Sequence, residues 1–119
     1  MKVLFAVLVL GLVPTHRADG GEPFACNMAA LSKTERAAHA KVALALLAAV
    51  QERKELRDGY AFRLPPAALP TASEWVALES RCCPFFTFEL ALESRGGPLW
   101  LRLRGPEGVK NFIRAELGV

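Results

Sequence analysis

The sequence has little net charge and few residues of the kinds that most enzymes use for catalysis. Its 15 lysines and arginines and 12 acidic residues leave a net charge of +3, with no basic run and no RNA-binding aromatic motif. The glycines form no phosphate-binding loop. One histidine, His39, follows the first twenty residues, and no nucleophile elbow is present. These absences argue against a nucleic-acid partner and against a hydrolase, and we expect a non-enzymatic protein.

Long hydrophobic runs are also missing. The apolar run at residues 3–13 is too short to span a bilayer, which takes roughly twenty residues. Lys2 precedes this run, Pro14 ends it, and Ala18 and Gly20 supply small residues before a cleavage point. Residues 1–20 therefore predict a signal peptide and an exported protein, periplasmic or secreted, with no stable membrane span after cleavage. A misplaced start codon would instead make the protein cytoplasmic.

The remaining chain has the size and composition of one folded domain. A hydrophobic fraction of 52% with 23% charged residues excludes disorder caused by low hydrophobicity. We expect a lead-in segment at residues 21–31 and a single α+β domain at residues 32–119.

Two helices are predicted from capping boxes. Ser32 with Glu35 opens a helix that should run from about residue 33 to residue 57, where Asp58-Gly59 ends it. Its middle is apolar nearly all round, which indicates cover by the sheet or by a second copy, and hence a homodimer. Thr71 with Glu74 opens a second helix, which Pro84 ends.

The strands show alternation of apolar and polar residues. Residues 60–64 form one strand, and residues 86–92 and 99–104 form a hairpin around "SRGG". Gly105-Pro106 opens the last helix. The predicted order is α-β-α-β-β-α, a two-layer α+β fold with a small three-stranded sheet that contains the hairpin. The inward-facing hairpin residues are expected to be Phe86, Phe88, Leu90, Leu92, Leu99, Leu101 and Leu103.

The cysteines are the feature that indicates chemistry. An odd number of cysteines in an oxidising compartment leaves at least one thiol unpaired, shared between chains or bound to a metal. Cys26, Cys82 and Cys83 would make a soft site suited to zinc or another thiophilic metal ion, and His39 would complete a Cys₃His set. Glu79 lies three and four residues before the paired cysteines, so it would accept a hydrogen bond from the ligands or ligate occasionally.

Three other uses of the cysteines stay open. A disulfide from Cys26 to one of the pair would staple the lead-in to the second helix and leave one thiol free. Thiol-redox catalysis is disfavoured, because Glu79 would raise a thiol pKa and the pair lies at a helix C-terminus. The cysteines could also be inert core residues of a structural or interaction module.

Four stretches within residues 24–117 carry a resemblance to a family: "CNMAALSKTERAAH", "ELRDGYAFRL", "EWVALESRCCPFFTFEL" and "LWLRLRGPEGVKNF". The chain resembles a family of small, uncharacterised bacterial proteins with an N-terminal Cys, an E-R-x-x-H helix, a C-C-P-F segment and a G-x-E-G-x-K-x-F ending. The resemblance implies no activity. It implies that these proteins share Cys26, Glu35, Arg36, His39, Glu79, Cys82 and Cys83. Because capping and packing do not explain the cysteines and His39, the leading hypothesis is metal binding.

Overall fold

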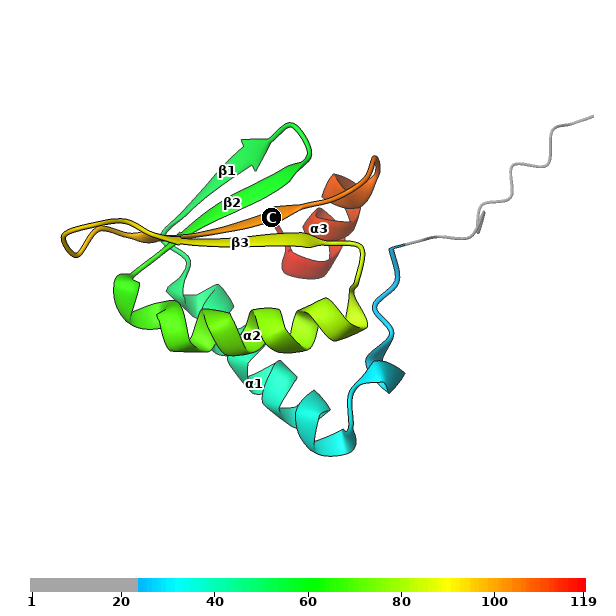
Figure 1. Cartoon of the computed structure of the whole chain (residues 1–119). Helices are drawn as coiled ribbons and strands as arrows, with labels where there is room; N and C mark the ends of the chain where they lie inside the picture. The colour runs from blue at the N-terminus through cyan, green and yellow to red at the C-terminus, as the bar shows by residue number, and fades with distance from the viewer. Residues whose placement is uncertain (1–23) are drawn as a thin grey trace, which may run out of the picture.

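The computed structural model of the protein describes residues 24–119 (Figure 1). Its elements are η1 (Met28–Ala30), α1 (Lys33–Ala49), β1 (Glu52–Leu56), β2 (Gly59–Leu64), η2 (Pro66–Ala68), α2 (Leu69–Cys82), β3 (Thr87–Leu92), β4 (Leu99–Arg104) and α3 (Val109–Leu117). The predicted signal peptide and the first residues of the lead-in lie outside the described residues. Within residues 24–119, no helix is long and apolar enough to cross a membrane.

The fold is α+β, as predicted, but the sheet has four strands and not three. All neighbouring strands are antiparallel, in the order β1-β2-β4-β3. The observed order of helices and strands is therefore α-β-β-α-β-β-α, which corrects the predicted α-β-α-β-β-α. Because β2 and β3 both pair with β4, they run parallel to each other, and α2 connects them.

The hydrophobic core lies between the sheet and the helices. In the register of β2 with β4, Phe62 faces Leu101, so alternate side chains of the two strands share one side. Those buried side chains are Tyr60, Phe62, Leu64, Leu99, Leu101 and Leu103. Figure 1 shows α1 and α2 packed against each other on one side of the sheet, with α3 beside the strands. Trp75 of α2 meets the ring of Phe88 edge to face at 5.9 Å.

β1 was missed because its sequence is rich in helix-forming charged residues. The first helix ends at Ala49 and not near residue 57, and β1 then pairs with β2 from Glu52↔Arg63 to Leu56↔Gly59. Charged residues suit this edge strand, whose outer side pairs with no other strand of residues 24–119. Gly59 is no helix cap: a Cβ at this position would lie 1.7 Å from the carbonyl oxygen of Leu103.

The starts of α2 and α3 also differ from the prediction. α2 begins at Leu69 after Ala68, and no side chain caps it, so the predicted Thr71–Glu74 capping box is wrong. α3 begins at Val109, and the N–H of Val109 donates to the carbonyl of Pro106 at 3.0 Å. The residue before α3 is Gly108, at φ 92°. Glycine suits this position because other residues rarely adopt a left-handed backbone.

The capping box of Ser32 with Glu35 and the predicted hairpin are confirmed. Ser32 accepts from the N–H of Glu35, and Glu35 accepts in return from the N–H of Ser32. The hairpin turn passes through positive φ at Arg95 and Gly96. Leu92, predicted to face inward, is 51% exposed at the end of β3, which lies at the edge of the sheet.

The first helix carries apolar side chains that the rest of the described chain leaves exposed. Val42 and Leu46 are buried against the rest of the protein, whereas Leu44 is 72% exposed and Leu47 is 40% exposed. The homodimer through this helix stays a prediction.

Candidate functional site

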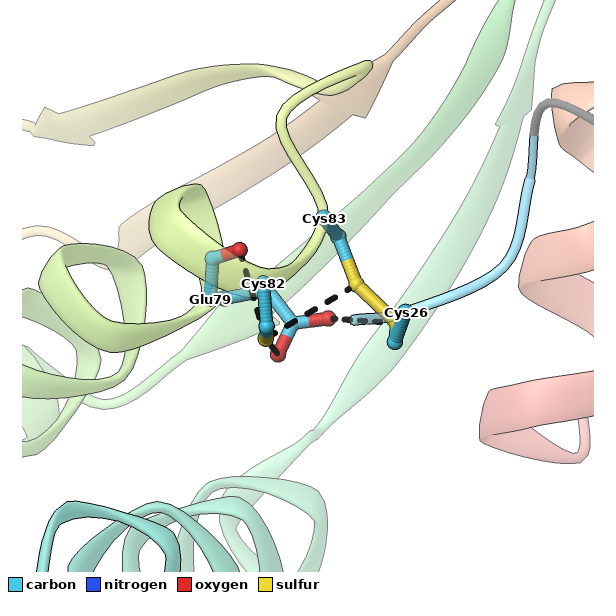
Figure 2. Close-up of side chains that lie close together, drawn as sticks. All are labelled: Cys26, Glu79, Cys82 and Cys83. Atoms are coloured by element: carbon cyan, nitrogen blue, oxygen red, sulfur yellow. Dashed lines mark hydrogen bonds between the residues drawn. A yellow bond between two sulfur atoms is a disulfide. The ribbon is translucent and has the colours of Figure 1, made fainter. Parts of the chain in front are cut away.

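The three cysteines meet where the lead-in crosses the C-terminal end of α2 (Figure 2). Pro84 follows the helix and disfavours helical backbone at Cys83, which leaves the helix at φ −124° and ψ 69°. The N–H of Cys83 still donates to the carbonyl of Glu79 at 2.7 Å. The N–H of Asn27 donates to the carbonyl of Cys82 at 2.8 Å, which fixes the lead-in beside the pair.

Cys26 and Cys83 form a disulfide, with Cα atoms 4.8 Å apart and a sequence separation of 57 residues. A disulfide from Cys26 to one of the adjacent cysteines was one of the alternatives predicted above. Cys82 keeps its free thiol. Cys82 and Cys83 are both fully buried. The two sulfur atoms of the adjacent cysteines are 3.9 Å apart.

Glu79 is the charged residue at the centre of this cluster, and it is only 7% exposed. Its Oε2 lies 3.8 Å from the sulfur of Cys82, and its Oε1 lies 3.9 Å from the sulfur of Cys26. The Cys82 thiol can donate to this carboxylate. Cys26 only contacts it, because a disulfide sulfur carries no hydrogen. The ligand-type atoms of Cys26, Glu79, Cys82 and Cys83 all lie within 4.8 Å of one another.

His39 lies behind Glu79 and outside this group of four. It comes from α1, and its Nε2 donates a hydrogen bond to Oε2 of Glu79, with both side chains largely buried. The structure therefore brings together all five residues predicted for the site. It places Glu79 among the sulfur atoms and His39 next to the carboxylate.

Burial and charge keep the Cys82 thiol protonated. Burial raises the pKa of Cys82 from its ordinary value of 9.0 to about 11, and the neighbouring Glu79 carboxylate adds to the rise. A thiol with this pKa is a weak nucleophile at neutral pH. A bound cation would act in the opposite direction, because metal ligation favours the thiolate.

Arg81 holds the same end of α2 in a second cluster, and no sequence pattern pointed to this residue. Arg81 forms an ion pair with Glu35 of the capping box, and it also donates to the carbonyl of Ala30 at 3.0 Å. The hydrogen bond from Arg81 lowers the pKa of Glu35 to about 2. Arg36 donates to the carbonyl of Leu31 at 2.7 Å. These contacts hold the lead-in and the start of α1 against the helix that carries the cysteines.

A groove gives solvent access to one side of the site. It has a volume of about 950 Å³, and Cys26, His39 and Glu79 form part of its wall. Aromatic side chains of the lead-in, α2 and α3 line it as well: Phe24, Trp75 and Phe112. The sequence alone could not predict this groove, because it depends on how three separate helices pack.

Comparison of the chain with protein-family models, with curated proteins and with solved structures finds no match in any of the three. The resemblance to a bacterial family therefore stays a prediction, and the function is argued from the geometry of the cysteines, Glu79 and His39.

Proposed function

We propose that the protein, once its disulfide is reduced, binds one zinc or softer metal ion. The thiolates of Cys26, Cys82 and Cys83 would be the ligands, together with the carboxylate of Glu79. The observation that carries this proposal is the closeness of these four ligand atoms, which lie within 4.8 Å of one another although they come from two distant parts of the chain.

The separations suit a four-coordinate ion. With Zn–S bonds of about 2.3 Å and Zn–O bonds of about 2.0 Å, neighbouring ligands of a tetrahedral zinc lie roughly 3.5–3.8 Å apart. The Cys82 sulfur lies 3.9 Å from the Cys83 sulfur and 3.8 Å from Oε2 of Glu79. The Cys26 sulfur lies 3.9 Å from the other carboxylate oxygen, Oε1. The bonded sulfur atoms of Cys26 and Cys83 have to separate, which reduction of the disulfide permits, and the ligand atoms that lie up to 4.8 Å apart have to move closer together.

The surroundings support a cation. Three thiolates and a carboxylate in a buried site repel one another, and a divalent ion offsets much of that charge. His39 would act as a positioning residue that holds the Glu79 carboxylate by a hydrogen bond, as partners of metal ligands commonly do. The predicted roles of these two residues are therefore exchanged in this proposal, and His39 would ligate only if Glu79 moved aside.

Redox state decides whether the proposed site exists. In the disulfide form only Cys82 retains a thiol, and disulfide sulfur atoms are not thiolate ligands. An exported protein would keep the disulfide, whereas a cytoplasmic one would hold its thiols reduced and ready for metal. The predicted export therefore favours the disulfide, whereas the proposed metal site requires the reduced thiols.

Native mass spectrometry of the full chain tests the proposal. The reduced protein with one equivalent of zinc should carry one zinc ion, and the oxidised protein should carry none. Cys82→Ser should abolish the adduct and Glu79→Gln should weaken it, whereas Glu74→Gln, an exposed position on the same helix, should leave it intact. Equal zinc loading of the oxidised protein, or full loading of Cys82→Ser, would refute the proposal.

The competing function is a structural or interaction module, which the disulfide itself favours. In that case Cys26–Cys83 holds the lead-in on α2, and Cys82 packs as a small apolar side chain. The reduced protein would then take up no stoichiometric zinc. Thiol-redox catalysis by Cys82 is the least favoured function, since the pKa of its thiol is raised and its side chain is fully buried.

A further inference from the structure

The two halves of the disulfide differ in their access to solvent. Cys83 is 0% exposed, whereas Cys26 is partly exposed and forms part of the groove wall. A molecule that enters the groove therefore meets Cys26 and not Cys83. The site of attack on a disulfide depends on such access.

The groove has walls that suit a small organic molecule. Its volume of about 950 Å³ is at the upper end of the range for ligand pockets. Apolar and aromatic side chains make up most of the wall. The charged and titratable side chains among them are His39, Glu79 and Glu116, with no lysine or arginine among the lining residues, so the charge of the groove disfavours anions.

We propose that Cys26 is a site of thiol–disulfide exchange with a small, neutral or cationic organic thiol that enters through this groove. The thiolate of the small molecule attacks the sulfur of Cys26 and forms a mixed disulfide. The Cys26–Cys83 bond breaks, and Cys83 leaves as a thiolate that takes up a proton from solvent. A second thiol then attacks the mixed disulfide, which releases Cys26 and an oxidised dimer of the small thiol.

This inference goes beyond metal binding and stands without it. The exchange depends on the exposure of Cys26 and on the groove, both of which belong to the disulfide form. Its product is the reduced protein, in which the three thiols of the proposed metal site are present together. Its tests contain no metal, so their failure is distinguishable from a failure to bind zinc.

Mapping of the first adduct tests the site of attack. The oxidised Cys82→Ser variant, in which the Cys82 thiol cannot rearrange the product, is exposed briefly to cysteamine and then quenched in acid, which stops attack by the released Cys83 thiolate, before alkylation. Tryptic peptides separate Cys26 from Cys83, because Lys33 and Arg81 lie between them. We expect cysteamine on Cys26 and the alkyl group on Cys83, in at least tenfold excess over the reverse. Cysteamine on Cys83 in comparable amount would overturn the proposal.

A pair of thiols of opposite charge tests the groove. Cysteamine and 2-mercaptoethanesulfonate are similar in size, and their rates are compared per thiolate. We expect cysteamine to open the disulfide about fivefold faster, and Glu116→Gln to reduce this preference about twofold. Glu107→Gln, an acidic position outside the groove, is the matched control and should leave the preference unchanged. Equal rates for the two thiols, or equal effects of the two substitutions, would contradict entry through this groove.

Discussion

At the scale of single residues, the site depends on how Cys82 and Cys83 point apart. Both follow Glu79 by one helical turn, so the sequence predicted that all three would be neighbours. It could not decide which cysteine would pair with Cys26. That choice is made by the backbone at Cys83, which leaves the helix before Pro84 and turns its sulfur toward the lead-in, while Cys82 stays helical and buried (Figure 2).

The ionisation of Cys82 gives the first prediction. In the oxidised native protein, the thiolate absorbance at 240 nm, taken as the difference from Cys82→Ser, should reach half its maximum near pH 11. The unfolded protein should reach it near pH 9, since burial and Glu79 no longer act on the thiol. Half-ionisation of the native thiol at or below pH 9 would contradict the described surroundings of Cys82.

The same shift affects stability, in a direction that the linkage relation determines. Because the folded pKa lies above the unfolded one, the stabilising contribution of the neutral thiol is fully present below pH 9 and is lost between pH 9 and pH 11. Its magnitude is on the order of 2 kcal/mol. Between pH 9 and pH 11, the free energy of unfolding of Cys82→Ser should therefore fall less than that of the unsubstituted protein, by this amount.

At the scale of elements, local chemistry predicted some helix starts well and others badly. Ser32 caps α1, whereas Thr71 caps nothing, although each is followed by a glutamate three residues later. The proline-rich loop before α2 forms a short 3₁₀ turn at Pro66–Ala68, and α2 continues directly from it. The capping pattern at Thr71 could not reveal this, because the turn has already started the helix.

Substitution of the two capping candidates separates them. Ser32→Ala should lower the free energy of unfolding by about 1 kcal/mol, because the N–H of Glu35 loses its acceptor. Thr71→Ala should change it by less than about 0.5 kcal/mol, since no helix-capping bond is lost. Chemical denaturation measures both. Equal losses in the two variants would contradict the start of α2 at Leu69.

β1 is the element that the sequence concealed, and Gly59, which follows the turn after β1, marks the close approach of β2 to β4. Gly59→Ala should destabilise the protein by more than about 3 kcal/mol, because the added Cβ would overlap the backbone oxygen of Leu103. Gly96→Ala is the matched control. It has open space around it and a φ of 72°, so it should lose only about 1–2 kcal/mol. Similar thermal shifts for the two variants would count against the close approach of β2 to β4.

At the scale of the whole molecule, the sequence predicted the two layers and the hairpin but not the size of the sheet or the groove. Alternating apolar residues in β2 and β4 identify the buried face directly. The groove and the contact of His39 with Glu79 arise from the packing of α1, α2 and α3, which no local pattern encodes. The disulfide adds a link between the lead-in and the core, across 57 residues of chain.

Opening of that link should weaken the whole fold. Closure of a loop of 57 residues constrains the unfolded chain by up to about 4 kcal/mol, so reduction should lower the free energy of unfolding by about 2–4 kcal/mol. Zinc should restore stability to the reduced protein, because it would bind the folded state only. Denaturation of the oxidised, reduced and zinc-loaded forms measures this. Zinc without effect on the reduced form would favour the structural role of the disulfide.

The central claim is that Cys26, Glu79, Cys82 and Cys83 hold one metal ion after reduction. Zinc K-edge X-ray absorption of the reduced, zinc-loaded protein tests this claim most directly, since it counts the ligand atoms and measures their distances. We expect three sulfur atoms at about 2.3 Å and one oxygen or nitrogen at about 2.0 Å. A first shell made only of oxygen and nitrogen, or one with a single sulfur atom, would contradict the proposed site.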